Sequence, residues 1–148
     1  MSKSVLVAVN DSLSSRAALE FVAGMPLVSE DSRITLVHIL RKPSASEELM
    51  GKKFAEEQPK RFLALLEKAK ETLVQNGFKA EHIETDLILE TYPTVADGII
   101  DQCKKRDCTM VVVGRKRMSK AEEFVLGDVC VKLVRGLDKV AVLVVKSQ

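Results

Sequence analysis

Short runs of consecutive apolar, mostly β-branched residues recur along the chain and alternate with apolar residues at helical spacing. Val5–Val9 and Met110–Val113 are apolar at every position, which is typical of strands covered by helices on both faces of a sheet. Strands that alternate with helices pair in parallel, because a helical crossover brings the chain back to the end of the sheet where it started. The pattern therefore predicts an α/β fold built on a parallel sheet.

Five strands and four helices are predicted in all. The strands span residues 5–9, 33–40, 83–89, 109–113 and 140–145, and we expect Gly114 to end the fourth. Asn76-Gly77 is expected to stop the second helix and Pro93 to open the third. Residues 41–60 are expected to be weakly ordered, because prolines and a glycine interrupt any long pattern there. The length of 148 residues favours a single domain, 1–148.

Charge and hydropathy exclude several classes of protein. The 23 basic and 21 acidic residues leave a net charge of +2, too little for a protein that binds nucleic acid by neutralising many phosphates. No apolar run approaches the roughly 18 residues of a membrane helix. Val5–Val9 is shorter than the core of a signal peptide, about 7–15 residues, so we expect a cytoplasmic protein. Cys103, Cys108 and Cys130 lack C-x-x-C spacing and are expected to be buried thiols.

Ligands of open parallel sheets bind outside the carboxyl ends of the strands. The loop after the fourth predicted strand is the most distinctive one at that edge. Gly114 is followed there by Arg115, Lys116 and Arg117, and later by Gly127. Such a loop offers backbone N–H groups and cations to an anion. The alternative is a solvated basic connector in which Gly114 only ends the strand.

Four segments together resemble the universal stress protein family over almost the whole chain: Val5-Leu-Val-Ala-Val-Asn-Asp-Ser12, Thr35–Ile39, Met110–Gly114 and Val140–Val145. The resemblance implies a doubly wound, Rossmann-like sheet of order 3-2-1-4-5, of the adenine nucleotide alpha hydrolase-like kind. In the ATP-binding branch it also implies a loop of Gly, two residues, Gly, nine residues, Gly, and then Ser or Thr. Gly114 and Gly127 match the first and third glycines with the correct spacing.

Two positions of this loop depart from the family pattern. Arg117 replaces the second glycine, which removes backbone freedom and adds a cation. Asp128 replaces the hydroxyl residue and places a carboxylate where it would repel a phosphate. Asn10 stands where the family usually has an aspartate. The nucleotide-contacting residues that the resemblance implies are Asn10, Ser12, Ile39, Gly114, Arg117, Gly127 and Asp128.

Each of these residues also has an ordinary structural interpretation. Asn10 and Ser12 are good helix N-caps, Ile39 is a normal strand core residue, and Asp128 suits a cap. We expect His38 to be a strand residue satisfied by a hydrogen bond rather than a catalyst. No metal site and no catalytic residues are predicted.

The sequence thus favours a stress-response regulator of the universal stress protein type that binds ATP or a related adenine nucleotide weakly, through a degenerate loop. The alternative is a member that binds no nucleotide and acts through dimerisation and protein interaction. The apolar strand Val140–Val145 and the family resemblance predict a homodimer through that strand. We predict no enzymatic activity, no nucleic-acid partner and no membrane partner, and the sequence identifies no protein partner.

Overall fold

The computed structural model describes residues 3–25, 32–40, 49–116, 120–121 and 129–147, with only the backbone at 52–55. A five-stranded sheet in the order β3-β2-β1-β4-β5 forms its centre. Every neighbouring pair of strands is parallel. The strands are β1 (Ser4–Ala8), β2 (Arg33–Ile39), β3 (Ile83–Ile88), β4 (Met110–Lys116) and β5 (Ala141–Ser147). The predicted α/β fold and strand order are confirmed.

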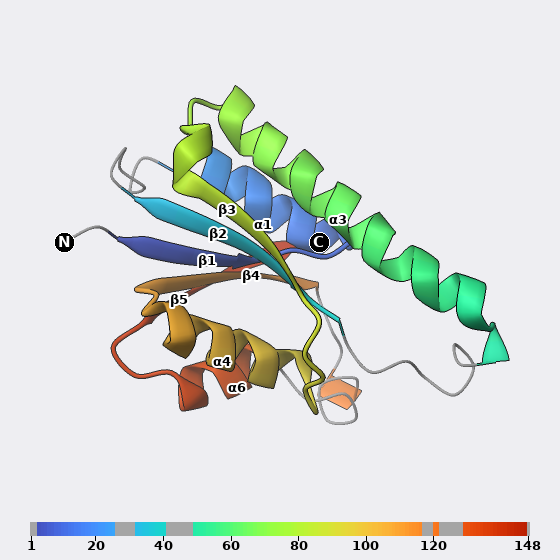
Figure 1. The fold of residues 1–148 in the computed structure, drawn as a ribbon. Helices are drawn as coiled ribbons and strands as arrows, with labels where there is room; N and C mark the ends of the chain where they lie inside the picture. The colour runs from blue at the N-terminus through green and yellow to red at the C-terminus, as the bar shows by residue number, and fades with distance from the viewer. Residues whose placement is uncertain (1–2, 26–31, 41–48, 117–119, 122–128, 148) are drawn as a thin grey trace.

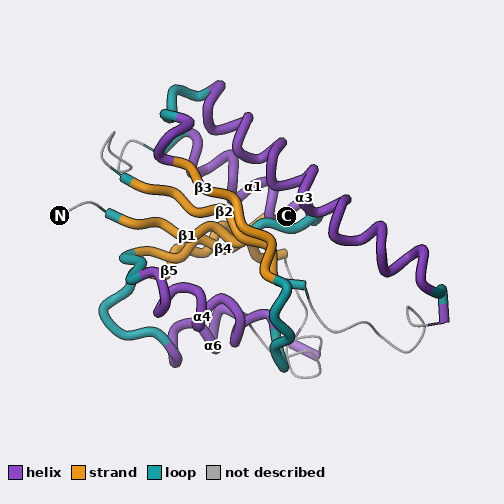
Figure 2. Tube along the Cα trace, in the orientation of Figure 1, coloured by secondary structure: helices purple, strands orange, loops and turns teal. Residues whose placement is uncertain are grey.

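Helices cover both faces of the sheet (Figure 1). On one face lie α1 (Leu13–Ala23) and α3 (Lys52–Gln75), and on the other lie α4 (Val95–Arg106) and α6 (Val129–Gly136). A short 3₁₀ helix, η1 (Ala80–His82), leads into β3. Figure 2 shows α3 running diagonally across its face and projecting well beyond the sheet at its first residues.

Strand residues alternate between two cores, as expected for a sheet buried on both faces. The core under α1 and α3 contains Val5, Val7, Ile34, Leu36 and Leu66 among its buried residues. The core under α4 and α6 contains Leu6, Val37, Ile99, Val111 and Leu133. Each central strand thus contributes to both cores, which fixes the register of the sheet.

Three expected boundaries were wrong. β4 continues to Lys116, and Gly114 pairs with Val145 inside the strand instead of ending it. α3 already begins at Lys52 and contains Pro59, so the second half of the segment expected to be weakly ordered is helical. The buried stripe Phe62, Leu66, Ala69 and Leu73 anchors that helix, and helix propagation from an anchored segment adds a bond for each residue fixed. α4 begins at Val95, because Thr94 rather than Pro93 caps it by accepting a hydrogen bond from the Asp97 N–H.

The expectation of free thiols at Cys103 and Cys108 was also wrong. The two residues form a disulfide, with their Cα atoms 5.1 Å apart. The end of α4 brings them together, because Asp107 adopts the left-handed conformation (φ 50°) and the Cys108 N–H donates to the Cys103 carbonyl oxygen at 3.1 Å. A C-x₄-C pair across a helix end thus reaches a separation that a disulfide requires.

No helix in the described part of the chain is both long and apolar enough to cross a lipid bilayer.

Candidate functional site at the carboxyl edge of the sheet

The first turn of α1 lies directly after β1 at the carboxyl edge. The Ser12 N–H donates to Asn10 Oδ1 at 2.8 Å, and the Ser15 N–H donates to Ser12 Oγ at 3.1 Å. The Asn10 N–H donates to Ser15 Oγ at 2.9 Å, and the hydroxyls of Ser12 and Ser14 lie 3.0 Å apart. Ser12 is therefore the N-cap of α1, and Asn10 stabilises the turn before it. The expected capping role is confirmed for Ser12 but not for Asn10, and the contact of both residues with a nucleotide stays a prediction.

Gly114 packs against this same turn. A Cβ atom on Gly114 would lie 2.1 Å from the Ser14 carbonyl oxygen and 2.7 Å from the Ser15 nitrogen. No side chain fits between β4 and α1 at this point, so Gly114 is required by the close approach of two backbones. The structure therefore brings Asn10, Ser12 and Gly114 together at one point of the carboxyl edge.

Ile39 lies on the opposite face from this cluster. It is the last residue of β2, is 5% exposed, and belongs to the core under α4 and α6. Its methyl groups lie 2.8 and 3.1 Å from the position that a Cβ on Gly98 of α4 would occupy. Ile39 thus has a packing role against α4, and its predicted place beside a base remains untested.

A second polar group on the same edge involves His38. Its Nδ1 lies 2.7 Å from the Val9 carbonyl oxygen, and because a carbonyl oxygen only accepts, Nδ1 carries the proton. The ring of Phe62 stacks on the imidazole with centroids 3.7 Å apart. Burial lowers the pKa of His38, and the hydrogen bond to Val9 opposes this shift only in part. The hydrogen bonding expected for His38 is present, and the residue is a neutral link between β2, β1 and α3.

An ion pair that sequence reasoning missed lies beside His38. Arg61 of α3 pairs with Asp11, in the loop after β1, and its guanidinium carbon lies 5.4 Å from the centre of the Phe62 ring. Both charged side chains are about half exposed, so the pair positions α3 more than it stabilises the fold. No motif links Asp11 with a helix residue 50 positions later; only the folded chain reveals the contact.

The basic segment after Gly114 is described in part. Arg115 is half-buried and Lys116 is exposed at the end of β4, on the same edge as the first turn of α1. Arg117, Gly127 and Asp128 lie outside the described residues. Four of the seven predicted contact residues are thus described, and three of these four share one cluster.

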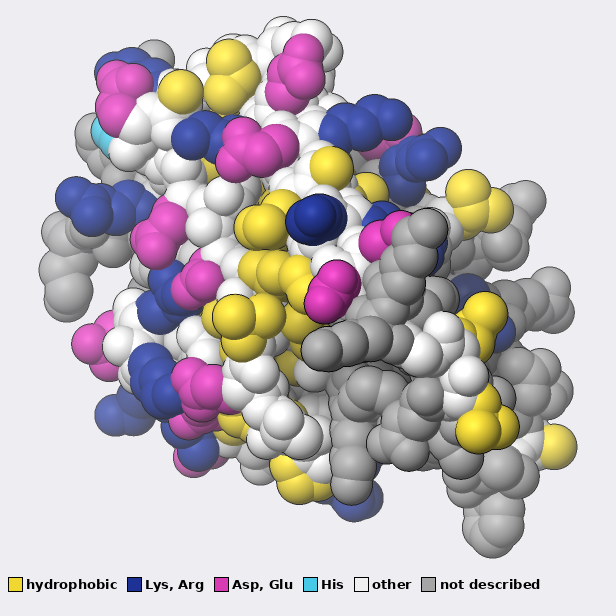
Figure 3. Space-filling model, turned by 45° about the vertical axis from the view of Figure 1, so that its right-hand side comes forward, with side chains coloured by type: hydrophobic (Ala, Val, Ile, Leu, Met, Phe, Trp, Pro, Cys, Tyr) yellow, Lys and Arg dark blue, Asp and Glu magenta, His cyan; other side chains and the backbone are white. Residues whose placement is uncertain are grey.

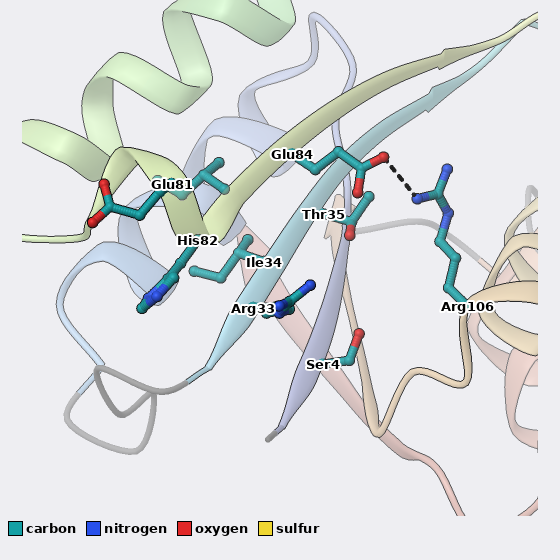
Figure 4. Close-up of a pocket in the computed structure, with 9 residues that line it drawn as sticks. Ser4, Arg33, Ile34, Thr35, Glu81, His82, Glu84 and Arg106 are labelled. Carbon is teal, nitrogen blue, oxygen red and sulfur yellow. Dashed lines mark hydrogen bonds and ion pairs between the residues drawn. The ribbon is translucent and has the colours of Figure 1, made fainter. Parts of the chain in front are cut away.

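A small cavity of about 200 Å³ lies at the other end of the sheet (Figure 4). It is lined by residues from β1, β2, η1, β3 and α4, among them Arg33, Glu81, Glu84 and Arg106. Arg106 pairs with Glu84 at 3.3 Å and also with Asp86. The lining contains both cations and carboxylates and favours neither an anionic nor a cationic ligand.

The molecular face in Figure 3 is similarly mixed in charge, with Lys and Arg dispersed among Asp and Glu around a central hydrophobic patch.

Metal ligands do not gather anywhere in the described residues, where no group of three or more His, Cys, Asp or Glu side chains could hold an ion.

Comparisons with known proteins identify a family and a fold. The model of the universal stress protein family matches residues 1–146. A universal stress protein solved in complex with cAMP has a TM-score of 0.69 and 16% identity, over 99% of this chain and 98% of that one. An Arabidopsis thaliana family protein solved with AMP bound has a TM-score of 0.67 and 21% identity, over 99% and 92% of the two chains. A hypothetical protein that served as a test case for assigning function from structure has a TM-score of 0.74 and 19% identity, over 100% and 98%. Among curated proteins, none matched the chain.

Proposed function

The chain belongs to the universal stress protein family, and we propose that it is a stress-response regulator that binds an adenine nucleotide weakly at the carboxyl ends of β1, β2 and β4. One observation carries the proposal. The first turn of α1, with Asn10 and Ser12, lies against Gly114 on the edge where the basic residues after Gly114 begin. The amino terminus of a helix attracts anions, and nearby cations add to that attraction. Structural neighbours solved with AMP and cAMP support the choice of an adenine nucleotide.

Weak affinity follows from how the edge is occupied. The backbone N–H groups of Ser12 and Ser15 already donate to the Asn10 and Ser12 side chains, so a phosphate must compete with these oxygens for the N–H groups. Asp128 adds a carboxylate that repels a phosphate by about 1–4 kcal/mol at 4 Å near a protein surface. We expect dissociation constants between micromolar and millimolar, or about −8 to −4 kcal/mol.

Binding without hydrolysis is the companion expectation. A general base must come within hydrogen-bond reach of the attacking water. His38 donates its Nδ1 proton to Val9, so Nε2 is its basic nitrogen, but the residue is buried and its ring stacks on Phe62, which restricts the access of water to it. We therefore propose that the protein is not an ATPase.

Calorimetry with ATP and AMP tests the nucleotide site. Asp128→Ser removes the repulsion and restores a hydroxyl, so it should tighten ATP binding by about 1–2 kcal/mol, or roughly five- to thirty-fold. Asp138→Ser is the matched control, because Asp138 is exposed in the turn before β5, at the opposite end of the sheet. Arg117→Gly should weaken binding if the guanidinium holds a phosphate. Undetectable binding in the wild type, both single variants and the double variant would refute the proposed site.

The edge strand β5 favours a second candidate function, dimerisation and protein interaction without a nucleotide. Val142, Leu143, Val144 and Val145 are only half-buried, and β4 is the neighbour of β5 in the sheet. Apolar edges of this kind tend to pair with another chain. We propose a homodimer through Val140–Val145, with its two chains related by a two-fold axis.

Sedimentation at micromolar concentration tests the dimer. Leu143→Lys should weaken association by about 2–4 kcal/mol, because it places an unpaired charge in the contact. Thr85→Lys makes the same change on β3, the strand at the other edge, and should leave the dimer intact. A monomeric wild type, or equal effects of the two variants, would refute pairing through β5.

A further inference from the structure

The end of α4 carries a feature that nucleotide binding does not use. Cys103, in the last turns of α4, and Cys108, two residues before β4, form a disulfide. It encloses the last three residues of α4 and the C-cap Asp107, which together are called the Lys104–Asp107 turn. Both cysteines are buried, at 1% and 6% exposure. The turn also has backbone hydrogen bonds, because the Cys108 N–H donates to Cys103 and the Asp107 N–H donates to Lys104.

The turn inside this disulfide carries a charged contact between α4 and β3. Arg106 projects from the end of α4 toward Glu84 (Figure 4) and pairs with Glu84 and Asp86 of β3. Its side chain is 21% exposed, and its Nε lies 3.4 Å from Gln102 Oε1. The conformation of the Lys104–Asp107 turn therefore determines whether Arg106 reaches the edge strand.

We propose that Cys103 and Cys108 are a reversible thiol–disulfide pair, whose oxidised state holds the Arg106 turn against β3 and whose reduced state releases it. The co-reactant is a low-molecular-weight thiol and its disulfide. A thiolate attacks Cys108 Sγ, the sulfur of the less buried cysteine, and the bond to Cys103 breaks as Cys103 leaves as a thiolate and takes up a proton. A second thiolate attacks the added sulfur, forms the external disulfide and releases Cys108, which is protonated in turn. Two external thiols are oxidised and the protein gains two thiols.

Two features distinguish a reversible pair from a structural cross-link. A disulfide stabilises mainly by closing a loop in the unfolded chain, and this short loop gives less stabilisation than a long one would. The backbone hydrogen bonds of the turn do not involve the sulfurs, so after reduction they alone hold the turn. Both redox states are therefore folded, and the difference between them is local.

Thiol trapping across buffers of reduced and oxidised glutathione tests the pair. After acid quenching and denaturation, alkylation counted by intact mass should change from three labels to one along the series, in a single two-electron step. The remaining label is on Cys130, which lies outside the disulfide. Cys130→Ser should keep the step with one label fewer, whereas Cys103→Ser should abolish it. A constant label count in every buffer, whether three or one, overturns the proposal.

Hydrogen exchange on the wild-type chain tests the release and needs no variant to fold. Reduction should speed exchange of the amides from Lys104 to Cys108 about tenfold, because the turn then opens more often. The exchange rate of the β3 amides should also rise on reduction, because the ion pairs of Arg106 with β3 are then released. In Arg106→Gln the β3 amides should exchange fast in both redox states while the turn still responds. Equal exchange of the turn in both states would overturn the release. Neither readout depends on nucleotide, so this proposal and the proposed function fail independently.

Discussion

The helices on the two faces of the sheet approach it in different ways. On the first face, α1 meets β4 backbone to backbone at Gly114. On the second face, α4 meets β2 through side chains, because the methyl groups of Ile39 fill the space above Gly98. A backbone contact has no rotatable atom that can give way, whereas a side chain can change its rotamer. The first face should therefore tolerate added volume much less than the second.

Gly114→Ala is the sharpest way to break this comparison. The new Cβ would meet the Ser14 carbonyl 2.1 Å away, so α1 must shift from the sheet. We expect the free energy of unfolding to fall by about 3 kcal/mol in denaturant titration. Gly24→Ala is the control, because its Cβ would meet only ordinary contacts beginning at 3.8 Å, and it should change stability by less than about 0.5 kcal/mol. Wild-type stability of Gly114→Ala would contradict the backbone contact.

Gly98→Ala tests the second face and should cost less, about 1 kcal/mol. Ile39 and Tyr92 atoms lie 2.8 and 2.9 Å from the new Cβ, but both are side-chain atoms that can move. The helix preference of alanine over glycine, also about 1 kcal/mol, offsets part of the strain. In an Ile39→Ala background only the contact with Tyr92 remains of these short ones, so Gly98→Ala should cost less there. An unchanged cost in that background would show that Ile39 is not the obstacle.

The smallest expected effect concerns pH and the contact of His38 with α3. In the folded chain, burial lowers the pKa of His38 below its ordinary value of 6.5. As the pH falls below about 6.5, the unfolded chain therefore takes up a proton at this residue before the folded chain does. The contribution of His38 to stability is therefore fully present above that pH and is lost as the pH falls. Denaturant titrations from pH 8 to pH 5 should show a shallower loss for His38→Gln than for the wild type. Equal slopes for His38→Gln and the wild type would contradict the assignment.

The sheet was predictable because its signal is local, whereas much of the site was not. Continuous apolar runs such as Val5–Val9 and helical stripes such as Phe62 to Leu73 fix the class of fold. The sequence also identified Asn10, Ser12 and Gly114 as residues of the same edge. It could not show that Gly114 serves packing, because the residue type alone does not distinguish a glycine that contacts a phosphate from one that packs against a helix. The pairs Arg61–Asp11 and Arg106–Asp86 join residues far apart in sequence, which only the folded chain brings together.

The strand order also determines how the sheet is completed as the chain is synthesised. β1 is made first but lies at the centre of the sheet, where it pairs with β2 on one side and with β4 on the other. The second side closes late, since the bond between Ser4 and Thr109 joins residues 105 positions apart. A nascent chain that ends before β4 can assemble β3, β2 and β1 alone, and it then exposes the apolar edge of β1 to other chains. β1, at the centre of the mature sheet, is thus an open edge while the chain is incomplete. An incomplete chain released from the ribosome would begin to aggregate at this strand.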